Sequence, residues 1–383
     1  MQKREERNSA VEWIRVAKRE NNTKRTYLIV NPYQGKHVPV SPEKARSLSA
    51  QLGEKLRERV RGEEKVLVIA FAETATAIGA GAAASLDGQS YYIQTTRETD
   101  CAIEYLYFSE VHSHASQQKL AANGLKEVLE KCGTVIFAED EVTTGNTICN
   151  LIEKLERFVP DMKHQYIIAS ILNGMDAETE EVFRQKQIGL VYLGKSKNEK
   201  YSKLVERSVC NGKRICCTGL VRKPDSMQVK KIFIKDGCNP RVLVRNKTYQ
   251  EKCRNFCKKA LEELGLKGKK SILVLGTEEC MYPGLCLADE IRGMETVQEV
   301  RFHATTRSPI LTSQEPDYPL HARYELKSLY DSERKTFVYN LKKYDLVIIV
   351  TDTETEKNEG LETLLYALSM QENKAIAVIE WRK

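Results

Sequence analysis

The chain has 383 residues, of which 30% are charged and 41% are hydrophobic, and its formal net charge is +7. This composition is typical of a globular protein, and the length exceeds one ordinary domain. No apolar run approaches the roughly 20 residues that cross a bilayer, and the charged N-terminus lacks the apolar core of a signal peptide. We therefore expect a cytoplasmic protein of two or three domains with no membrane partner.

The eleven cysteines are scattered, and the sequence contains no CxxC pair. Cys253 and Cys257 lie four apart on an expected helix, where two thiols on one face could ligate a metal. A second ligand pair with zinc-finger spacing is missing from the sequence. Free thiols in a reducing compartment are therefore the favoured interpretation.

The first half of the chain alternates expected strands and helices. Residues 1–22 are highly charged, with apolar residues at loose helical spacing, which favours an N-terminal helix or arm. A short strand at 27–30 runs into a polar loop that contains Lys36 and His37. The remaining elements are a helix at 41–60, a buried parallel strand at 66–72, an Ala- and Gly-rich helix at 77–86, strands at 91–94, 105–108 and 166–172, a helix at 176–186 and a strand at 190–193.

The stretch 135–147 is the most informative part of the sequence. An apolar strand ends in Glu139 and Asp140, and the hydroxyl-rich loop after it leads into a helix at 148–158; the loop residues are Thr143, Thr144, Gly145, Asn146 and Thr147. Backbone N–H groups at a helix N-terminus, with a glycine that permits close approach, suit a phosphate. Two carboxylates would repel a phosphate, so they must accept hydrogen bonds from hydroxyls or hold a cation. A phosphorylated sugar suits both the acid pair and the loop. Alternatively, an acid pair followed by a helix-capping Thr can be an ordinary strand-to-helix connection of an α/β fold.

This stretch resembles the phosphoribosyl-pyrophosphate (PRPP) binding motif of type I phosphoribosyltransferases. The resemblance implies an α/β fold with a Rossmann-like parallel sheet. It also implies that Glu139 and Asp140 contact the ribose hydroxyls and that residues 143–147 hold the 5′-phosphate. Mg²⁺ is expected to enter with PRPP rather than on direct protein ligands.

Two further segments resemble the pyrophosphate-binding parts of that family. The loop before the Ala- and Gly-rich helix matches the pyrophosphate loop, which implies contacts from Glu73, Thr74 and Thr76; the small residues of the helix would allow close approach to a bulky anion. Arg97 follows the strand at 91–94, in the place where orotate-type enzymes carry a basic residue that reaches the pyrophosphate. A guanidinium can hold two phosphate oxygens at once, so the residue type suits that role.

The resemblance also implies two parts that cover the substrate. The segment 109–116, with His112 and His114, matches the mobile loop that closes over PRPP, although a His-Ser-His sequence could also be a metal site. Lys36 and His37 match the N-terminal hood over the base, and they are candidates for contacting it.

The segments 35–37, 71–77, 95–97 and 110–115 look most like the orotate-like phosphoribosyltransferases of bacterial tellurium-resistance and stress gene clusters. Those enzymes carry a C-terminal domain named for a Thr-Arg-Ser-Pro (TRSP) motif, which this chain has at 306–309. We therefore expect four regions: a charged arm at 1–22, a phosphoribosyltransferase domain at 23–195, a basic linker at 196–246 and a TRSP α/β domain at 247–383.

The basic linker begins with a stretch, 195–235, that contains twelve Lys or Arg residues against three acids. Such a stretch could meet nucleic acid or an anionic substrate. A solvated, flexible connector is the favoured interpretation, because no series of aromatic residues accompanies the charges.

The expected elements of the last domain repeat the order of the first. They are a helix at 247–264, strands at 272–276 and 297–303 around a helix at 282–291, a strand at 346–350, a helix at 361–368 and a strand at 375–379. In this alignment the chemically distinctive residues pair as Glu73 with Glu279, Arg97 with Arg307, and Asp140 with Asp352. The separations are 24 against 28 residues and 43 against 45. The last domain is thus a possible degenerate copy of the first, with convergent α/β layout as the alternative.

Arg307 leads to two opposed expectations. An open cleft lined by polar residues would bind a nucleotide-sized ligand; its members would be Glu278, Glu279, Thr306, Arg307, Ser308 and Asp352. Alternatively, Arg307 pairs with Glu279 or Asp352 and ties the loop down. The loop that matches the phosphate cradle reads Glu354-Thr-Glu-Lys-Asn, whose acids would repel a 5′-phosphate.

The expected activity is the Mg²⁺-dependent transfer of the phosphoribosyl group from PRPP to a base-like acceptor, in the biosynthesis of a nucleotide-like metabolite. Related enzymes often form homodimers. Two rivals stay open: a PRPP-sensing regulator without turnover, and an RNA- or nucleotide-binding adaptor that acts through the basic stretch.

Overall fold

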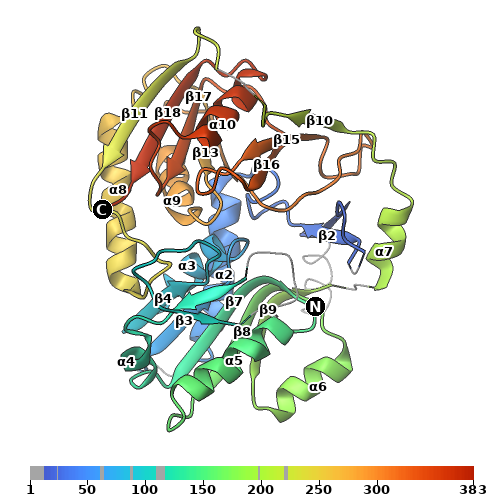
Figure 1. Ribbon diagram of the computed structural model, residues 1–383, viewed down its shortest axis with the longest axis vertical. Coiled ribbons are helices and arrows are strands. Elements are labelled where there is room, and N and C mark those ends of the chain that lie inside the picture. Colours follow the sequence, from blue (N-terminus) through green and yellow to red (C-terminus); the bar gives the residue numbers. More distant parts are fainter. Residues whose placement is uncertain are drawn as a thin grey trace. The chain divides into compact units, whose positions relative to one another are not determined.

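The computed structural model describes residues 13–23, 25–60, 64–86, 89–108, 117–196, 199–219 and 223–383. These residues divide into two compact units, each with its own parallel sheet (Figure 1). The central unit comprises 47–196 and 238–252, and the terminal unit comprises 1–46, 197–237 and 253–383. No helix in the described part of the chain is long and apolar enough to cross a membrane.

The central unit is built on a six-stranded sheet with the order β12-β4-β3-β7-β8-β9. Its strands are β3 (Val66–Ala70), β4 (Ser90–Gln94), β7 (Thr134–Val142), β8 (Gln165–Asn173), β9 (Gly189–Lys195) and the short β12 (Val244–Arg245). All neighbours pair in parallel except β12, which is antiparallel to β4. Every residue of β3 is buried, as expected for a continuous apolar strand in a parallel sheet.

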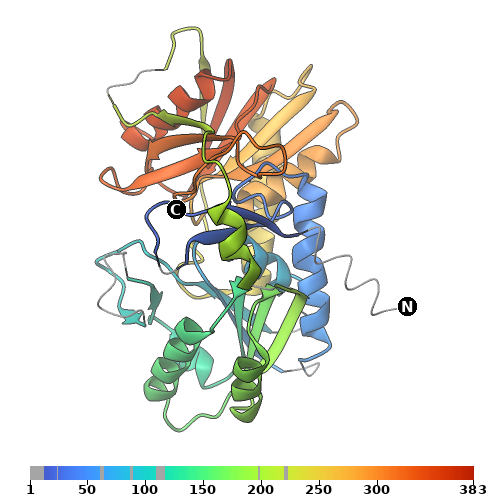
Figure 2. The ribbon, with the colours of Figure 1, turned by 90° about the vertical axis from the view of Figure 1, so that its right-hand side faces the viewer.

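Helices cover both faces of this sheet (Figure 2). On one face, α4 (Leu125–Leu129), α5 (Asn146–Phe158) and α6 (Ala177–Gln185) share one apolar core with the strands. The buried residues of α5 are the helically spaced ones that the sequence predicted: Ile148, Leu151, Ile152 and Leu155. On the other face lies α3 (Thr76–Ala83), and a small hairpin of β5 (Tyr105–Tyr107) and β6 (Lys119–Ala121) completes the unit.

The terminal unit contains a five-stranded, all-parallel sheet with the order β11-β18-β17-β13-β14. The strands are β11 (Gln228–Ile234), β13 (Ser271–Gly276), β14 (Glu299–Ala304), β17 (Leu346–Thr351) and β18 (Ala375–Trp381). A second sheet joins β10 (Lys213–Cys216), β15 (Ala322–Lys327) and β16 (Lys335–Tyr339), and β1 (Arg15–Lys18) pairs with β2 (Tyr27–Val30). The helices are α7 (Glu199–Glu206), α9 (Tyr282–Arg292) and α10 (Glu359–Ser369), while α2 (Pro42–Arg57) and α8 (Asn246–Glu263) contribute residues to both units.

The two sheets share a strand order. Numbered along the chain within each repeat, β4-β3-β7-β8 and β14-β13-β17-β18 both read second, first, third, fourth. The α/β fold expected for each half is therefore present, and the topology agrees with the predicted repeat.

Two expectations about the ends of the phosphoribosyltransferase region are corrected. The N-terminal helix is wrong for residues 15–18, which form strand β1 because their pairing with β2 outweighs the loose helical spacing; residues 1–12 lie outside the described part. The flexible basic connector is wrong as well. Its residues form α7, β10 and β11, and β11 buries Ile232 and Ile234 while its lysines stay exposed. Part of the charge run therefore lies at exposed positions of an edge strand rather than in a solvated connector.

The division of the chain also differs from the expected boundaries. Residues 23–46 group with the terminal unit, although the sequence assigned them to the first domain. Residues 238–252 group with the central unit, because β12 extends its sheet and α8 begins there.

Candidate active site

The acid pair lies at the carboxyl end of β7, the middle strand of the central sheet. Glu139, Asp140 and Glu141 form a row of partly exposed carboxylates. The Thr74 hydroxyl donates to Asp140 Oδ1 at 3.0 Å, and the Asp140 N–H donates to Glu139 Oε1 at 3.1 Å. Burial, and then the charge of Asp140, raise the pKa of Glu139 well above its usual range. Such a cluster is stabilised by a ligand that brings a cation or hydroxyl donors.

The loop after these acids presents an open helix N-terminus. Gly145 precedes the first turn of α5 with a φ of +70° and offers no capping side chain, while the Thr144 hydroxyl accepts the Asn146 N–H at the long distance of 3.4 Å. Thr144, Asn146 and Thr147 are exposed, and Thr143 is partly exposed. A 13-residue helix with uncapped N–H groups and a partial positive charge is a favourable place for a phosphate.

Gly145 has a second role that the sequence did not reveal. A Cβ atom at this position would lie 2.5 Å from Phe183 Cζ and 3.0 Å from Met175 Cε. The glycine is thus needed for its left-handed backbone and for the packing of α6 beneath the loop. A larger residue here would disturb the core as well as the phosphate cradle.

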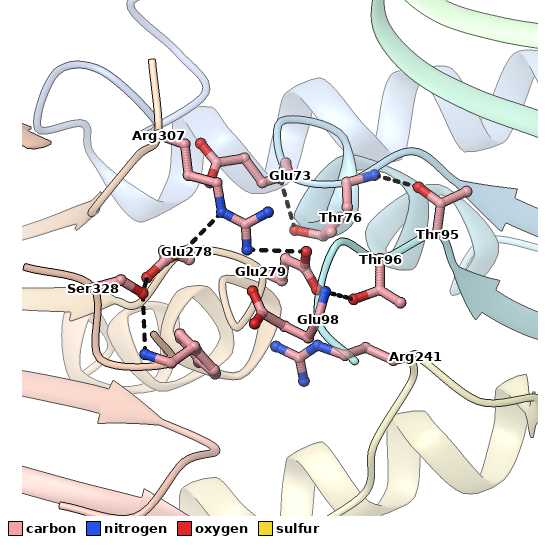
Figure 3. A network of polar contacts seen from close by, with 12 residues as sticks. Glu73, Thr76, Thr95, Thr96, Glu98, Arg241, Glu278, Glu279, Arg307 and Ser328 are labelled. Carbon is pink, nitrogen blue, oxygen red and sulfur yellow. Dashed lines mark hydrogen bonds and ion pairs between the residues drawn. The ribbon is translucent and has the colours of Figure 1, made fainter. Parts of the chain in front are cut away.

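The expected pyrophosphate loop connects β3 to α3. The peptide bond between Ala72 and Glu73 is cis, the Ala72 N–H donates to Thr95 Oγ1 at 2.9 Å, and the Thr76 hydroxyl donates to the Glu73 carbonyl at 3.2 Å (Figure 3). Glu73 and Thr76 are 8% and 1% exposed, so this loop is held by buried contacts.

The small residues of α3 do not line the loop, contrary to the expectation that they admit a bulky anion. All eight residues of the helix, Ile78 included, are buried, and a Cβ on Gly79 would lie 2.4 Å from Ala70 Cβ and 3.2 Å from Ala138 Cβ. They allow the helix to pack closely on β3 and β7.

Arg97 follows β4, the neighbour of β3. It is partly exposed, and the turn beside it is fixed by Thr96, whose Oγ1 accepts the Glu98 N–H at 2.9 Å (Figure 3). Glu73, Arg97 and Asp140 thus follow three adjacent parallel strands, whose carboxyl ends lie at one edge of the sheet.

Two cations at the same edge escaped the sequence reasoning. Lys119 in β6 is buried, lies 4.5 Å from the centroid of the Tyr105 ring and donates to the Thr99 hydroxyl. Arg241 is 8% exposed, and the preceding Pro240 carbonyl accepts the N–H of Gln94, the last residue of β4, at 2.8 Å. Arg241 is far from β4 in sequence, so only the fold could reveal it. His112 and His114, by contrast, lie outside the described residues.

Comparison with known families agrees with this geometry. Residues 13–191 match the family described as phosphoribosyl transferase, and residues 243–368 match a TRSP domain that lies C-terminal to it. The chain combines a phosphoribosyltransferase domain with a TRSP domain. Its fold is accordingly that of the type I phosphoribosyltransferases, followed by a second α/β region.

Three solved structures that are named as phosphoribosyltransferases have a partial likeness to this chain. An adenine phosphoribosyltransferase from Trypanosoma brucei, in complex with AMP, pyrophosphate and ribose-5-phosphate, is 11% identical; the match covers 50% of this chain and 80% of that chain, with a TM-score of 0.36. The orotate phosphoribosyltransferase from Aeropyrum pernix is 16% identical; the match covers 53% of this chain and 96% of that chain, with a TM-score of 0.30. An adenine phosphoribosyltransferase from Thermoanaerobacter pseudethanolicus is 12% identical; the match covers 49% of this chain and 99% of that chain, with a TM-score of 0.32. No curated protein matches the chain.

The residues expected to form the hood, Lys36 and His37, lie in the terminal unit and are 0% and 1% exposed. Lys36 Nζ donates to the carbonyls of Glu278 and Thr305 at 3.2 and 3.1 Å, respectively. Two backbone acceptors from the TRSP region thus engage this ammonium. The arrangement favours a structural role for Lys36 over contact with a base.

Arg307, the arginine of the TRSP motif, also forms ion pairs within the terminal unit. Arg307 Nε donates to Glu278 Oε2 at 2.8 Å and its NH2 group to Glu279 Oε1 at 3.2 Å (Figure 3). The side chains are 8%, 1% and 0% exposed, respectively. Arg334 and Ser328 also contact Glu278, at 3.2 and 2.5 Å. The structure therefore favours the alternative in which Arg307 ties the loop down.

The other members of the expected cleft also have internal contacts. Thr306 is buried, and its Oγ1 accepts the Ser308 N–H at 3.2 Å. Asp352 Oδ1 accepts from the Tyr330 hydroxyl at 2.5 Å.

Hydrogen bonds repeat between the two regions in the same order. Ala72 N–H donates to Thr95 Oγ1 at 2.9 Å in the phosphoribosyltransferase domain, and Glu278 N–H donates to Thr305 Oγ1 at 3.0 Å in the TRSP domain. These pairs link the loop after the first strand to the end of the second strand in each sheet. The agreement favours duplication over convergent layout.

The next residue repeats as well. Thr96 forms an isolated antiparallel bridge with Lys119 of the β5–β6 hairpin, and Thr306 forms one with Phe337 of the β15–β16 hairpin. Sequence reasoning missed β15 and β16, although they match a hairpin of the first domain.

Proposed function

We propose that the central unit transfers the phosphoribosyl group of PRPP to a base-like acceptor and releases pyrophosphate. The observation that carries the proposal is the adjacency, within β7 and α5, of a carboxylate row and an open anion-binding helix N-terminus. The carboxylates are suited to ribose hydroxyls, and the N–H groups of residues 145–147 are suited to the 5′-phosphate.

In this proposal the pyrophosphate end is held by the loop after β3, with Glu73, Thr74 and Thr76, and by Arg97. Cleavage of the glycosidic bond builds positive charge on the ribose ring and negative charge on the leaving group. Fixed charges placed at both ends can lower that barrier without a covalent nucleophile. Lys119 and Arg241 would add positive charge near the end of β4.

The residues present fit a divalent cation that enters with the substrate. Carboxylate oxygens at the end of β7, together with pyrophosphate oxygens, are ligand types that Mg²⁺ accepts. When bound, the ion would neutralise charge on the pyrophosphate.

The finer parts of the proposal rest on the resemblance described above. They are an orotate-type acceptor, a nucleotide-like product used in tellurium resistance or a stress response, a cytoplasmic homodimer, and closure of the loop with His112 and His114 over PRPP.

The test is pyrophosphate release by the full-length protein with PRPP, Mg²⁺ and a panel of pyrimidine and purine bases. We expect release with at least one base, and we expect Asp140→Asn to reduce it by roughly 10²-fold or more. Asp352→Asn is the matched control, because Asp352 is the equivalent acid in the terminal unit. PRPP binding by calorimetry without release for any base would support the sensor instead.

A further inference from the structure

Three thiols and one arginine gather in the terminal unit, whereas the residues assigned to PRPP belong to the central unit. Cys253 and Cys257 lie on successive turns of α8 and are 1% and 3% exposed. Cys286 lies on α9 and is the only one of the three that is partly exposed. The Cys253 thiol hydrogen-bonds the sulfur of Cys286. The sequence singled out the pair on α8, and the fold adds the third thiol.

Arg46 of α2 supplies a fixed positive charge beside Cys286. Its NH1 group lies 3.8 Å from Cys286 Sγ and donates to the Tyr282 hydroxyl at 3.1 Å. Its Nε lies 3.5 Å from Asp289 Oδ2, which holds the guanidinium in place. A thiol beside a cation, with partial access to solvent, has the surroundings of a reactive cysteine.

The surroundings shift the pKa values of Cys286 and Cys257 in opposite directions. The hydrogen bond from Cys253, and then the charge of Arg46, lower the pKa of Cys286 against the opposing effects of burial and Asp289. Burial, and then the neighbouring Cys286, raise the pKa of Cys257. The pKa of Cys286 is thus lowered and that of Cys257 is raised, and Cys253 is the hydrogen-bonded neighbour of Cys286.

We propose that Cys286 and Cys253 form a redox-active dithiol that a hydroperoxide converts into a disulfide linking α9 to α8. The Cys286 thiolate attacks the peroxide oxygen, the O–O bond breaks, and the products are a sulfenic acid on Cys286 and an alcohol or water. The Cys253 sulfur then displaces hydroxide from the sulfenic acid, and its proton leaves as water. In sum, two thiols and one hydroperoxide give one disulfide, one alcohol or water, and one water.

A metal site is less consistent with the same residues. Within the described part of the chain, no group of three or more His, Cys, Asp or Glu side chains is arranged to hold a metal ion. A guanidinium next to the exposed sulfur would also repel a cation.

The first experiment maps disulfides in the full-length protein. The protein is treated with hydrogen peroxide, free thiols are alkylated under denaturing conditions, and peptides are identified by mass spectrometry. We expect a Cys253–Cys286 link that a dithiol reductant removes. The exposed Cys101 serves as an internal reference for unassisted oxidation. Oxidation of Cys101 without that link, or a link through Cys257 instead, would overturn the proposal.

Three substitutions sharpen the assignment. Cys257→Ser is the matched control and should keep the link, because Cys257 lies one turn away on the same helix. Cys286→Ser should remove it. Cys253→Ser should leave a sulfenic acid on Cys286 that dimedone traps, and trapping on another cysteine would contradict the assigned order of attack.

A fourth substitution tests the arginine. Arg46→Met should slow iodoacetamide labelling of Cys286 relative to Cys101 several-fold at neutral pH, because the variant lacks the positive charge that favours the Cys286 thiolate. An unchanged ratio would contradict activation by Arg46.

Discussion

In the central unit the loop after β7 leads to a helix whose N-terminus is open, whereas in the terminal unit the corresponding loop after β17 is closed by the protein's own side chains. Asn358 caps α10 by accepting the Leu361 N–H at 3.0 Å. The Thr355 N–H and hydroxyl donate to Glu380 at 3.0 and 2.9 Å, respectively. An internal carboxylate therefore takes the donors that an external anion would need.

The register of the strands shows which residue of the central unit corresponds to this carboxylate. Glu380 of β18 pairs with Thr351 of β17, and in the central unit Ser170 of β8 pairs with Glu139 of β7. A glutamate in the terminal unit thus stands where the central unit has a buried serine. The same strand order thus supports an open loop in one unit and a closed loop in the other, because ligand binding requires polar groups that the fold leaves unsatisfied.

The strongest test of this contrast compares Arg307→Ala with Arg97→Ala. Loss of Arg307 would leave the nearly inaccessible Glu278 and Glu279 without their main cation, although Arg334 stays near Glu278. We expect a loss of about 3 kcal/mol in the free energy of unfolding, at the lower end for a broken buried pair. Both tryptophans, Trp13 and Trp381, lie in the terminal unit, so urea unfolding followed by tryptophan fluorescence measures this loss.

For Arg97→Ala the expected change in that free energy is below about 0.5 kcal/mol, because the side chain is partly exposed. Its effect should fall on catalysis instead. Equal destabilisation by the two substitutions would remove the distinction between a tethering and a functional arginine.

The next test compares the two aspartates. Asp140→Asn should reduce turnover by roughly 10²-fold or more, if its hydrogen bonds to the ribose strengthen as charge develops. Asp352→Asn should change turnover by less than about twofold, because its partner Tyr330 belongs to the terminal unit. Steady-state pyrophosphate release measures both, and a similar loss in both variants would make the terminal unit part of the catalytic apparatus.

A third comparison concerns the backbone of the two loops. Gly145 and Lys357 follow their aspartates at the same distance, and both have positive φ, +70° and +52°. Gly145→Val should destabilise the central unit by about 3 kcal/mol through backbone strain and the clash with Phe183. The exposed Lys357→Gly should stabilise its loop by up to about 1 kcal/mol.

Hydrogen exchange followed by mass spectrometry can assign each change to its own unit. Gly265→Ala is a suitable control, since no atom lies within 4 Å of the added Cβ. Normal protection of β7 and α5 in Gly145→Val would show that the loop tolerates a side chain.

The smallest expected effect is the pH dependence of Glu139→Gln. The raised pKa means that native Glu139 keeps its proton above the ordinary value of 4.5, where the unfolded chain has lost it. The stability from this group is thus fully present below 4.5 and falls as pH rises through the native pKa. The glutamine variant lacks this loss, so its advantage in unfolding temperature should grow as pH rises from 4.5 through the native pKa of Glu139. Calorimetry measures the difference, and a constant offset would contradict the assigned pKa.

The sequence by itself determined the main strands and helices of the two large sheets, and the motif after β7. Continuous apolar runs predicted β3, β7 and β17, and helical spacing predicted the buried face of α5, because these patterns depend on neighbours along the chain. The order of acids, hydroxyls and glycine after β7 was likewise sufficient to recognise an anion loop beside a carboxylate pair. The positions of Glu279, Arg307 and Asp352, which match those of Glu73, Arg97 and Asp140, indicate the repeat from the sequence alone.

Only the tertiary structure decided which polar groups are left for a ligand. Lys36 lies at the position that the resemblance assigns to the hood, but it donates hydrogen bonds to the carbonyls of Glu278 and Thr305, which follow β13 and β14. Arg307 and Arg97 follow the same Thr-Thr pair, yet Arg307 is buried between two carboxylates of its own unit, whereas Arg97 is partly exposed. The local sequence specifies a side chain's chemistry, whereas its hydrogen-bond partners come from segments hundreds of residues away, so its availability is settled by packing.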